Sequence, residues 1–100
     1  MTGWRVRAEA ASAGCGHLEG LPEDVAPASE CEDCVREGTT WVHLRRCLRC
    51  DHVGCCDNSP RRHATAHWRA TDHPVIASAE PDEGWAWCYP DQLLLVHASE

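Results

Sequence analysis

Cysteine and histidine are concentrated between Cys47 and His73, a stretch that contains four residues of each type. It begins with two cysteines spaced Cys-x2-Cys and ends with His63, His67 and His73. Two thiolates at this spacing can reach the same tetrahedral ion, and two histidines four residues apart lie on one face of a helix. So many thiolate and imidazole ligands in so short a stretch indicate that the chain binds zinc.

Further candidate ligands lie on either side of this stretch, including a Cys-x-His pair and a second Cys-x2-Cys pair. The twelve candidates are Cys15, His17, Cys31, Cys34, Cys47, Cys50, one of Cys55 and Cys56, His63, His67, His73, Cys88 and Asp91. Twelve ligands complete three tetrahedral sites, so we expect two to three zinc ions. Because a site with four protein ligands has no position open to water, these ions would be structural and not catalytic.

The composition leaves little material for a hydrophobic core. The chain has 100 residues, a formal net charge of −7 and no phenylalanine, and alanine and cysteine supply much of its 43% apolar content. So few branched aliphatic residues with so much charge would otherwise indicate disorder. Bound metal must therefore contribute much of the stability. Arginine without any lysine is typical of a GC-rich genome and favours a bacterial source.

Eight cysteines in a secreted chain of this length would predict four disulfides. The Cys-x2-Cys pairs beside histidines at ligand spacing favour metal-bound thiolates instead, and therefore the reducing cytoplasm. The start of the chain lacks the apolar run of a secretory leader, and no stretch approaches membrane-spanning length. We expect a flexible lead-in over residues 1–14 and one monomeric domain over residues 15–97.

Local patterns predict the elements that position these ligands. Residues 18–30 are expected to form a loop, and the clearest helix is expected at residues 61–70, with Ser59 as its N-cap. In the first predicted strand Val42 and Leu44 would share one face. The strands are expected at residues 39–46, 74–78, 85–89 and 93–96, with a short extended segment at 53–56.

Three other functions that use these residue types fit less well. Cys47, Cys50, His63 and His67 have the spacing of a DNA-binding finger, but their linker lacks the apolar residues of a finger core and the chain is acidic. The pair His63-x3-His67 lacks the glutamate base of a metalloprotease. Neither Cys-x2-Cys pair lies in the βαβ pattern of a redox enzyme. We expect no enzymatic activity and no nucleic-acid or membrane partner.

The ordered ligands resemble those of the UBP-type zinc finger, a ubiquitin-binding domain of many ubiquitin-specific proteases and of one histone deacetylase. The shared segments appear here as CGH, CEDC, CLRCDHVGC, HATAHWRATDHP and WCY, and they span the chain from about Cys15 to Val96. The resemblance implies an α+β fold with a small twisted antiparallel sheet, one or two flanking helices and up to three structural zinc sites. Here it would form a stand-alone domain.

The resemblance also groups the ligands into three sites. These are Cys15, His17 and Cys88 with Asp91; Cys31, Cys34, Cys55 and His63; and Cys47, Cys50, His67 and His73. Asp91 stands where the family has a cysteine, so it either supplies a carboxylate ligand or leaves a weaker site, and we expect an occupied one. Cys55 keeps the family spacing from Cys50, whereas Cys56 keeps the spacing to His63. We favour Cys55.

Family members that bind ubiquitin hold its C-terminal Gly-Gly in a pocket with an arginine and aromatic walls. Trp87 and Tyr89 match two of the aromatic positions, although both residues could equally serve core packing. Asp57 replaces the arginine and would repel a carboxylate. Three other arginines could reach the pocket, namely Arg45, Arg61 and Arg62. We expect a module that binds a protein or peptide tail, such as a ubiquitin-like C-terminus; the alternative is a purely structural zinc-stabilised interaction protein without a tail pocket.

Overall fold

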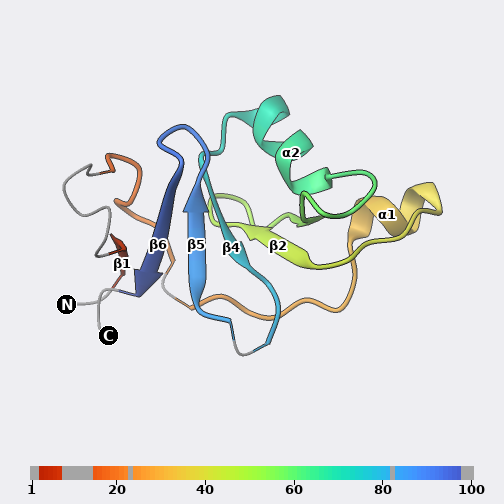
Figure 1. Ribbon diagram of the computed structural model, residues 1–100, viewed down its shortest axis with the longest axis horizontal. Helices are drawn as coiled ribbons and strands as arrows, with labels where there is room; N and C mark the ends of the chain where they lie inside the picture. Colours follow the sequence, from red (N-terminus) through yellow and green to blue (C-terminus); the bar gives the residue numbers. More distant parts are fainter. Residues whose placement is uncertain (1–2, 8–14, 23, 82, 98–100) are drawn as a thin grey trace.

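One antiparallel sheet with the strand order β1-β6-β5-β4-β2-β3 forms the centre of the molecule (Figure 1). The computed structural model describes residues 3–7, 15–22, 24–81 and 83–97. The strands are Trp4–Val6 (β1), Leu44–Cys47 (β2), Val53–Cys55 (β3), Val75–Ser78 (β4), Trp85–Cys88 (β5) and Leu93–His97 (β6). Helices Glu32–Glu37 (α1) and His63–Thr71 (α2) both pack against β3. The expected α+β fold is confirmed.

Alternation along the central strands gives the sheet two different faces. In β5, Ala86 and Cys88 are fully buried, whereas Trp85 and Trp87 are only half-buried. Side chains on successive strand residues point to opposite faces, so the two tryptophans share one face. The register places Trp87 opposite Leu94 of β6, which continues this half-buried face onto the next strand.

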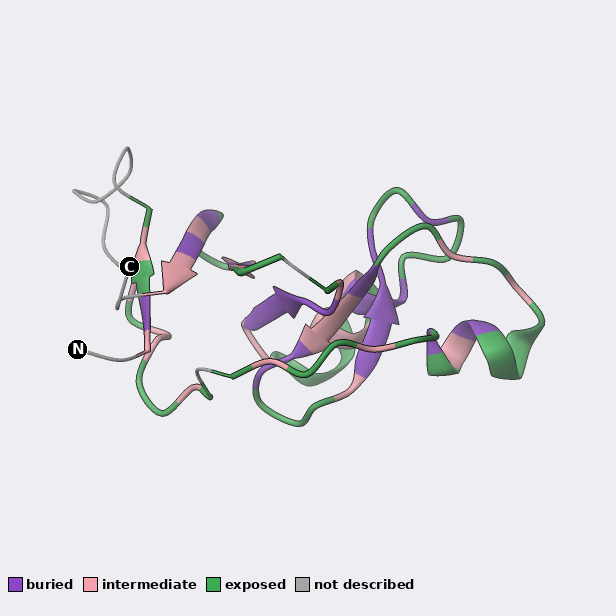
Figure 2. Ribbon diagram, turned by 90° about the horizontal axis from the view of Figure 1, so that it is seen from below, coloured by how far each residue is buried: buried purple, intermediate pink, exposed green. Residues whose placement is uncertain are grey.

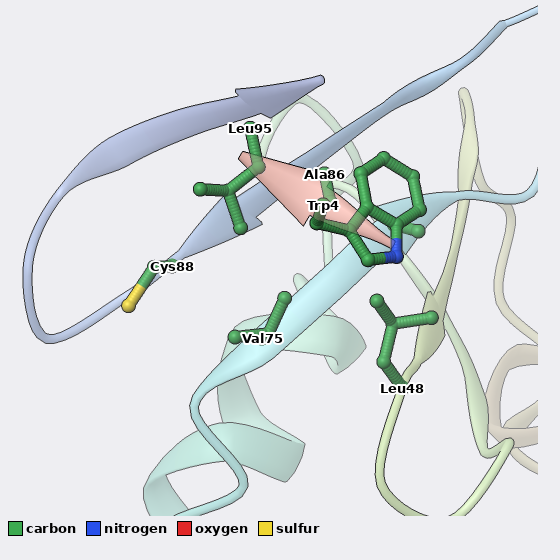
Figure 3. Packing of buried hydrophobic residues seen from close by; sticks show 7 residues of the cluster. Trp4, Leu48, Val75, Ala86, Cys88 and Leu95 are labelled. Atoms are coloured by element: carbon green, nitrogen blue, oxygen red, sulfur yellow. The ribbon is translucent and has the colours of Figure 1, made fainter. Parts of the chain in front are cut away.

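The fully buried face carries the main hydrophobic cluster. Figure 3 shows the Trp4 indole among small and branched side chains. The cluster consists of Trp4, Leu48, Val75, Ala77, Ala86, Cys88 and Leu95. Trp4 also donates from its indole nitrogen to the Pro22 carbonyl at 2.8 Å, which holds the loop that follows Cys15 against the sheet. Two alanines and a cysteine leave the space that the large indole fills.

Strand β1 lies within the segment that we expected to be a flexible lead-in. Trp4 is 6% exposed, and β1 pairs with β6 from Trp4↔His97 to Val6↔Leu95. The expectation is therefore wrong for Trp4–Val6, because the indole supplies apolar surface that the remainder of the core lacks. Residues 1–2 and 8–14 of that segment lie outside the described residues.

The second cluster lies between α1 and the β2–β3 edge, and half of its members are cysteines. It consists of Cys31, Cys34, Leu44, Val53, Cys55 and Ala79. Helix α1 was not predicted, because its six residues are mostly charged and only Cys34 is buried. Figure 2 shows this helix mostly in the green of exposed residues. The helix depends on Cys31, whose sulfur accepts the Cys34 backbone N–H, and ends at Gly38 with φ 74°.

Two predicted element boundaries are wrong, and Ser59 explains both. Its hydroxyl accepts the Val42 backbone N–H at 2.8 Å, so Ser59 does not cap α2, which begins at His63 after Arg62 in the left-handed region. The same contact holds the Val42 backbone N–H outside the sheet, and the strand expected from residue 39 begins at Leu44. Val42 is 52% exposed while Leu44 is buried, so the two do not share a core face.

The close packing of α2 on β3 predicts a strict requirement for glycine at position 54. A Cβ there would lie 2.6 Å from the Ala64 backbone nitrogen and 2.9 Å from its Cα. We expect Gly54→Ala to destabilise the zinc-loaded protein by about 1–3 kcal/mol in denaturant titrations, because backbone must move to admit the methyl group. Gly84→Ala is the matched control, since its added methyl would meet only the His97 ring at an ordinary contact distance of 3.4 Å. Equal stability of both variants would contradict the close approach.

Candidate zinc centres and a pocket on the sheet

The structure brings the predicted ligands together in three groups of four, with the membership that the resemblance implied. In each group the ligand atoms all lie within 4.8 Å of one another. The α1 site is Cys31, Cys34, Cys55 and His63; the α2 site is Cys47, Cys50, His67 and His73; and the N-terminal site is Cys15, His17, Cys88 and Asp91. All eight cysteines are free thiols, as metal binding requires.

The spacing of these atoms fits a tetrahedral ion. With bonds of about 2.0–2.3 Å to zinc, a tetrahedron has ligand–ligand edges of about 3.3–3.8 Å. In the α1 site, His63 Nδ1 lies 3.3 Å from the Cys34 sulfur, which is 3.8 Å from the Cys55 sulfur. In the α2 site, the Cys47 and Cys50 sulfurs lie 3.5 Å and 3.3 Å from histidine nitrogens. Hydrogen bonds between thiols and imidazoles alone would not require all four ligand atoms of a group to surround one centre.

All four ligands of the α1 site are buried. Burial raises the pKa of Cys31 to about 12, so the thiol keeps its proton at neutral pH until a cation replaces it. His63 presents Nδ1 to the site, and its Nε2 lies 3.1 Å from a Glu37 carboxylate oxygen. This carboxylate–histidine pair fixes the ring orientation, as in many zinc proteins.

The α2 site joins the β2–β3 turn to α2 and to the residues that follow it. His67 and His73 are half-buried, and Cys50 is exposed. Burial, together with the neighbouring rings of His52 and His73, lowers the pKa of His67 and favours the neutral form that binds metal. His52 stacks on His67 with ring centroids 4.5 Å apart, and its Nε2 is 2.8 Å from Asp33 on α1.

The N-terminal site joins the loop before residue 18 to the end of β5. Asp91 stands 3.5 Å from the Cys88 sulfur and 3.0 Å from His17 Nδ1, so its carboxylate faces the other ligands. Hydrogen bonds from Cys15 and then from His17 and Cys88 lower the pKa of this exposed acid. Burial raises the pKa of Cys88 to about 12. A carboxylate therefore takes the place that the family gives to a cysteine.

Cys56 lies outside all three groups. Its sulfur is 3.5 Å from the Ser59 hydroxyl, whereas the adjacent Cys55 sulfur lies 3.5 Å from His63 Nδ1. The strand β3 ends at Cys55, and alternation along the extended backbone sends the two neighbouring side chains to opposite sides. The structure therefore places Cys55, as favoured above, and not Cys56, at the α1 site.

Residues 31–99 match the family described as "Zn-finger in ubiquitin-hydrolases and other protein". This chain belongs to that zinc-finger family. The chain also resembles the solution NMR structure of protein RPA1320 from Rhodopseudomonas palustris, with 48% identity and a TM-score of 0.73 over 86% of this chain and 84% of that one. No curated protein matches the chain. Together with the three ligand groups, the family establishes a zinc-binding module with two to three structural ions.

The half-buried face of the sheet carries a pocket of about 680 Å³. Its walls come from β2, β4, β5 and β6, from residue 7, and from the segment between β3 and α2. The lining residues are Arg7, Arg45, Cys56, Asp57, Asn58, Ile76, Trp85, Trp87, Tyr89, Leu94 and Val96. Both predicted partner-binding residues, Trp87 and Tyr89, line it and are half-buried. Tyr89 also stacks on Trp68 of α2, with ring centroids 4.5 Å apart.

Two arginines line the pocket, and sequence reasoning found only one of them. Arg45 was one of the three candidates, and its guanidinium lies 4.6 Å from the centroid of the Trp85 ring. Arg7 was missed because it follows β1 in the presumed lead-in; its backbone N–H donates to the Leu94 carbonyl at 2.9 Å. The other two candidates, Arg61 and Arg62, line a neighbouring concavity on α2.

Neither helix of the described part of the chain is long and apolar enough to cross a membrane.

The positions of the two adjacent cysteines predict different zinc contents for their serine variants. We expect Cys55→Ser to lose one zinc ion, because three ligands remain at a buried site that relies on four. Cys56→Ser should keep the full complement, since its sulfur contacts Ser59 instead. Native mass spectrometry of both variants counts the bound ions. A loss of zinc in Cys56→Ser with none in Cys55→Ser would overturn the assignment.

The exposed carboxylate of the N-terminal site predicts that this ion is released first. We expect Asp91→Ala to reduce the zinc content by one ion and leave the α1 and α2 sites loaded, because neither contains Asp91. Asp91→Cys should restore binding and slow release to a chelator, since a thiolate is the usual family ligand at this position. Stopped-flow release with a colorimetric chelator measures the phases. An unchanged zinc count in Asp91→Ala would exclude the carboxylate as a ligand.

Proposed function

We propose that this chain is a non-catalytic module that binds the C-terminal tail of a partner protein in the pocket on its sheet. The observation that carries the proposal is the open cavity of about 680 Å³ with aromatic walls and Arg45 in its lining. Aromatic walls with a few placed polar groups are typical of sites for small or extended ligands. A free peptide carboxylate supplies the negative charge that an arginine there would pair with.

Arg45 is held in position by three parts of its surroundings. Its backbone lies in β2, its guanidinium stacks over Trp85, and one of its amino groups donates to the Leu44 carbonyl at 3.0 Å. These contacts leave other N–H groups of the fork for a ligand. An arginine that is already ordered loses less conformational entropy when it binds a carboxylate.

Asp57 occupies the position of the family arginine, and its negative charge is partly compensated by a hydrogen bond within the protein. One carboxylate oxygen accepts a hydrogen bond from the Thr65 hydroxyl at 2.5 Å, and that hydroxyl lies 3.3 Å from the Tyr89 hydroxyl. The positive charge of the pocket therefore comes from the sheet and not from the segment before α2. The proposed ligand is therefore a tail with a free C-terminal carboxylate, of which a ubiquitin-like C-terminus is one example.

The same contacts argue against an enzyme. Seven of the eight cysteines are in ligand groups, and the Cys56 sulfur contacts the Ser59 hydroxyl. We propose further that the module works as a monomer in the cytoplasm, where free thiols persist. The negative net charge disfavours nucleic acid and anionic membrane surfaces as partners.

Titration with a fluorescent peptide that ends in Gly-Gly, and with the same peptide amidated, tests the proposal. We expect the free acid to bind at least about tenfold more tightly, since amidation removes the charge that faces Arg45. Trp87→Ala and Arg45→Gln should each abolish this difference while zinc content stays unchanged. Val42→Ala, at an exposed position outside the pocket, is the control. Equal binding of acid and amide would favour the purely structural alternative.

A further inference from the structure

A second concavity lies beside the pocket, and Asp57 lines both. It has a volume of about 520 Å³ and follows one side of α2. We call this concavity the α2 groove. Its lining residues are Asp57, Arg61, Arg62, Thr65, Ala66, Arg69 and Ala70. A ligand chain that leaves the pocket past Asp57 enters this groove directly.

The groove is basic on a chain that is acidic as a whole. Three of the nine arginines line it, although the formal net charge is −7. Arg62 directly precedes α2 and Arg69 lies in its last turn, so the two arginines stand at the two ends of the groove with the small Ala66 between them. The alanine leaves room for a ligand along the helix surface.

Two of these arginines lack an acidic partner. Arg61 pairs with Glu37 at 3.2 Å. Neither Arg62 nor Arg69 forms an ion pair or a side-chain hydrogen bond within the described ranges 3–7, 15–22, 24–81 and 83–97. In contrast, Arg36 on α1 pairs with Asp33 at 2.5 Å. The groove thus holds unused positive charge beside the pocket.

We propose that the α2 groove binds acidic side chains of the partner's tail, a few residues before the carboxylate that the pocket holds. This inference rests on the proposed function and adds a sequence preference to it. Arg62 and Arg69 are separated by about 10 Å along a helix, which is the length of about three extended residues. Two acidic residues spaced two or three apart in an extended tail can therefore reach both arginines.

Asp57 separates the two binding regions and sets the register. It is exposed, and its carboxylate accepts a hydrogen bond from the Thr65 hydroxyl. The carboxylate would repel an acidic side chain of the ligand at the junction, and it can accept hydrogen bonds from backbone N–H groups of the ligand. The tail therefore carries its acidic residues beyond the junction, over α2, and not next to its last residues. A nucleic acid fits this layout poorly, because a continuous row of phosphates would place charge against Asp57.

The test uses zinc-loaded protein and a set of short peptides that all end in Gly-Gly. One carries two glutamates a few residues upstream, the second has glutamines there, and the third arginines; each is made as free acid and as amide. We expect the glutamate acid to bind about three- to tenfold more tightly than the glutamine acid, and the arginine acid to bind most weakly. The double variant Arg62→Gln with Arg69→Gln should reduce these differences to less than about twofold. Arg36→Gln, which removes a charge outside the groove, should preserve them.

The remaining outcomes separate the two proposals. Carboxylate-dependent binding that is equal for the glutamate, glutamine and arginine peptides overturns the acidic preference and leaves the tail-binding function standing. The same holds if the preference survives in the double arginine variant. Equal binding of every acid and its amide removes the tail-binding function and the inference with it. If the glutamate amide binds as tightly as the glutamate acid, the groove binds acidic chains independently of the pocket, which also overturns the proposal.

Discussion

Buried thiolates need a cation, and the rest of this fold depends on that requirement. Cys31, Cys34 and Cys55 are 0% exposed and make up half of the second cluster of buried residues. A protonated thiol buried there is a small apolar group, and three of them fill less space than branched aliphatic side chains would. With zinc bound, the same residues become a rigid cross-link, and the binding free energy of the ion is folding free energy. The metal thus replaces the aliphatic core that the composition lacks.

The three ligand groups also determine which face of the sheet remains available. The N-terminal site holds Cys88 on the buried face at the end of β5. Because strand side chains alternate, Trp87 and Tyr89 must then project to the opposite face, where they line the pocket. The α2 site fixes α2 beside that face, and Trp68 of α2 stacks on Tyr89. A metal ligand therefore orients the residues next to it toward the pocket on the opposite face.

The grouping of the ligands and most of the strands could be predicted from the sequence, whereas strand β1 and helix α1 could not. Cys-x2-Cys and His-x3-His carry their geometry in their spacing, and the three groups have the membership that the family pattern implies. Strand β1 and helix α1 were missed because contacts with distant or non-helical residues stabilise them. Trp4 of β1 packs into a core formed by residues far along the chain, and α1 is capped by the sulfur of Cys31. Ser59 has the residue type of a helix cap, but the Val42 backbone uses its hydroxyl.

The pocket contains positive charge although an aspartate replaces the arginine expected from the family. The family position carries Asp57, and Thr65 of α2 and Arg45 of β2 compensate in different ways: the threonine hydroxyl binds the carboxylate, and the arginine provides positive charge from the sheet. Because the cation lies on the sheet, Asp57 stands as an acid at the exit of the pocket, where it attracts basic side chains of a tail and repels acidic ones. Beyond that exit, Arg62 and Arg69 reverse the sign again. The order of charges from the pocket outward is positive, negative and positive, so a complementary tail ends in a carboxylate, is uncharged or donates N–H groups at the junction, and becomes acidic over α2.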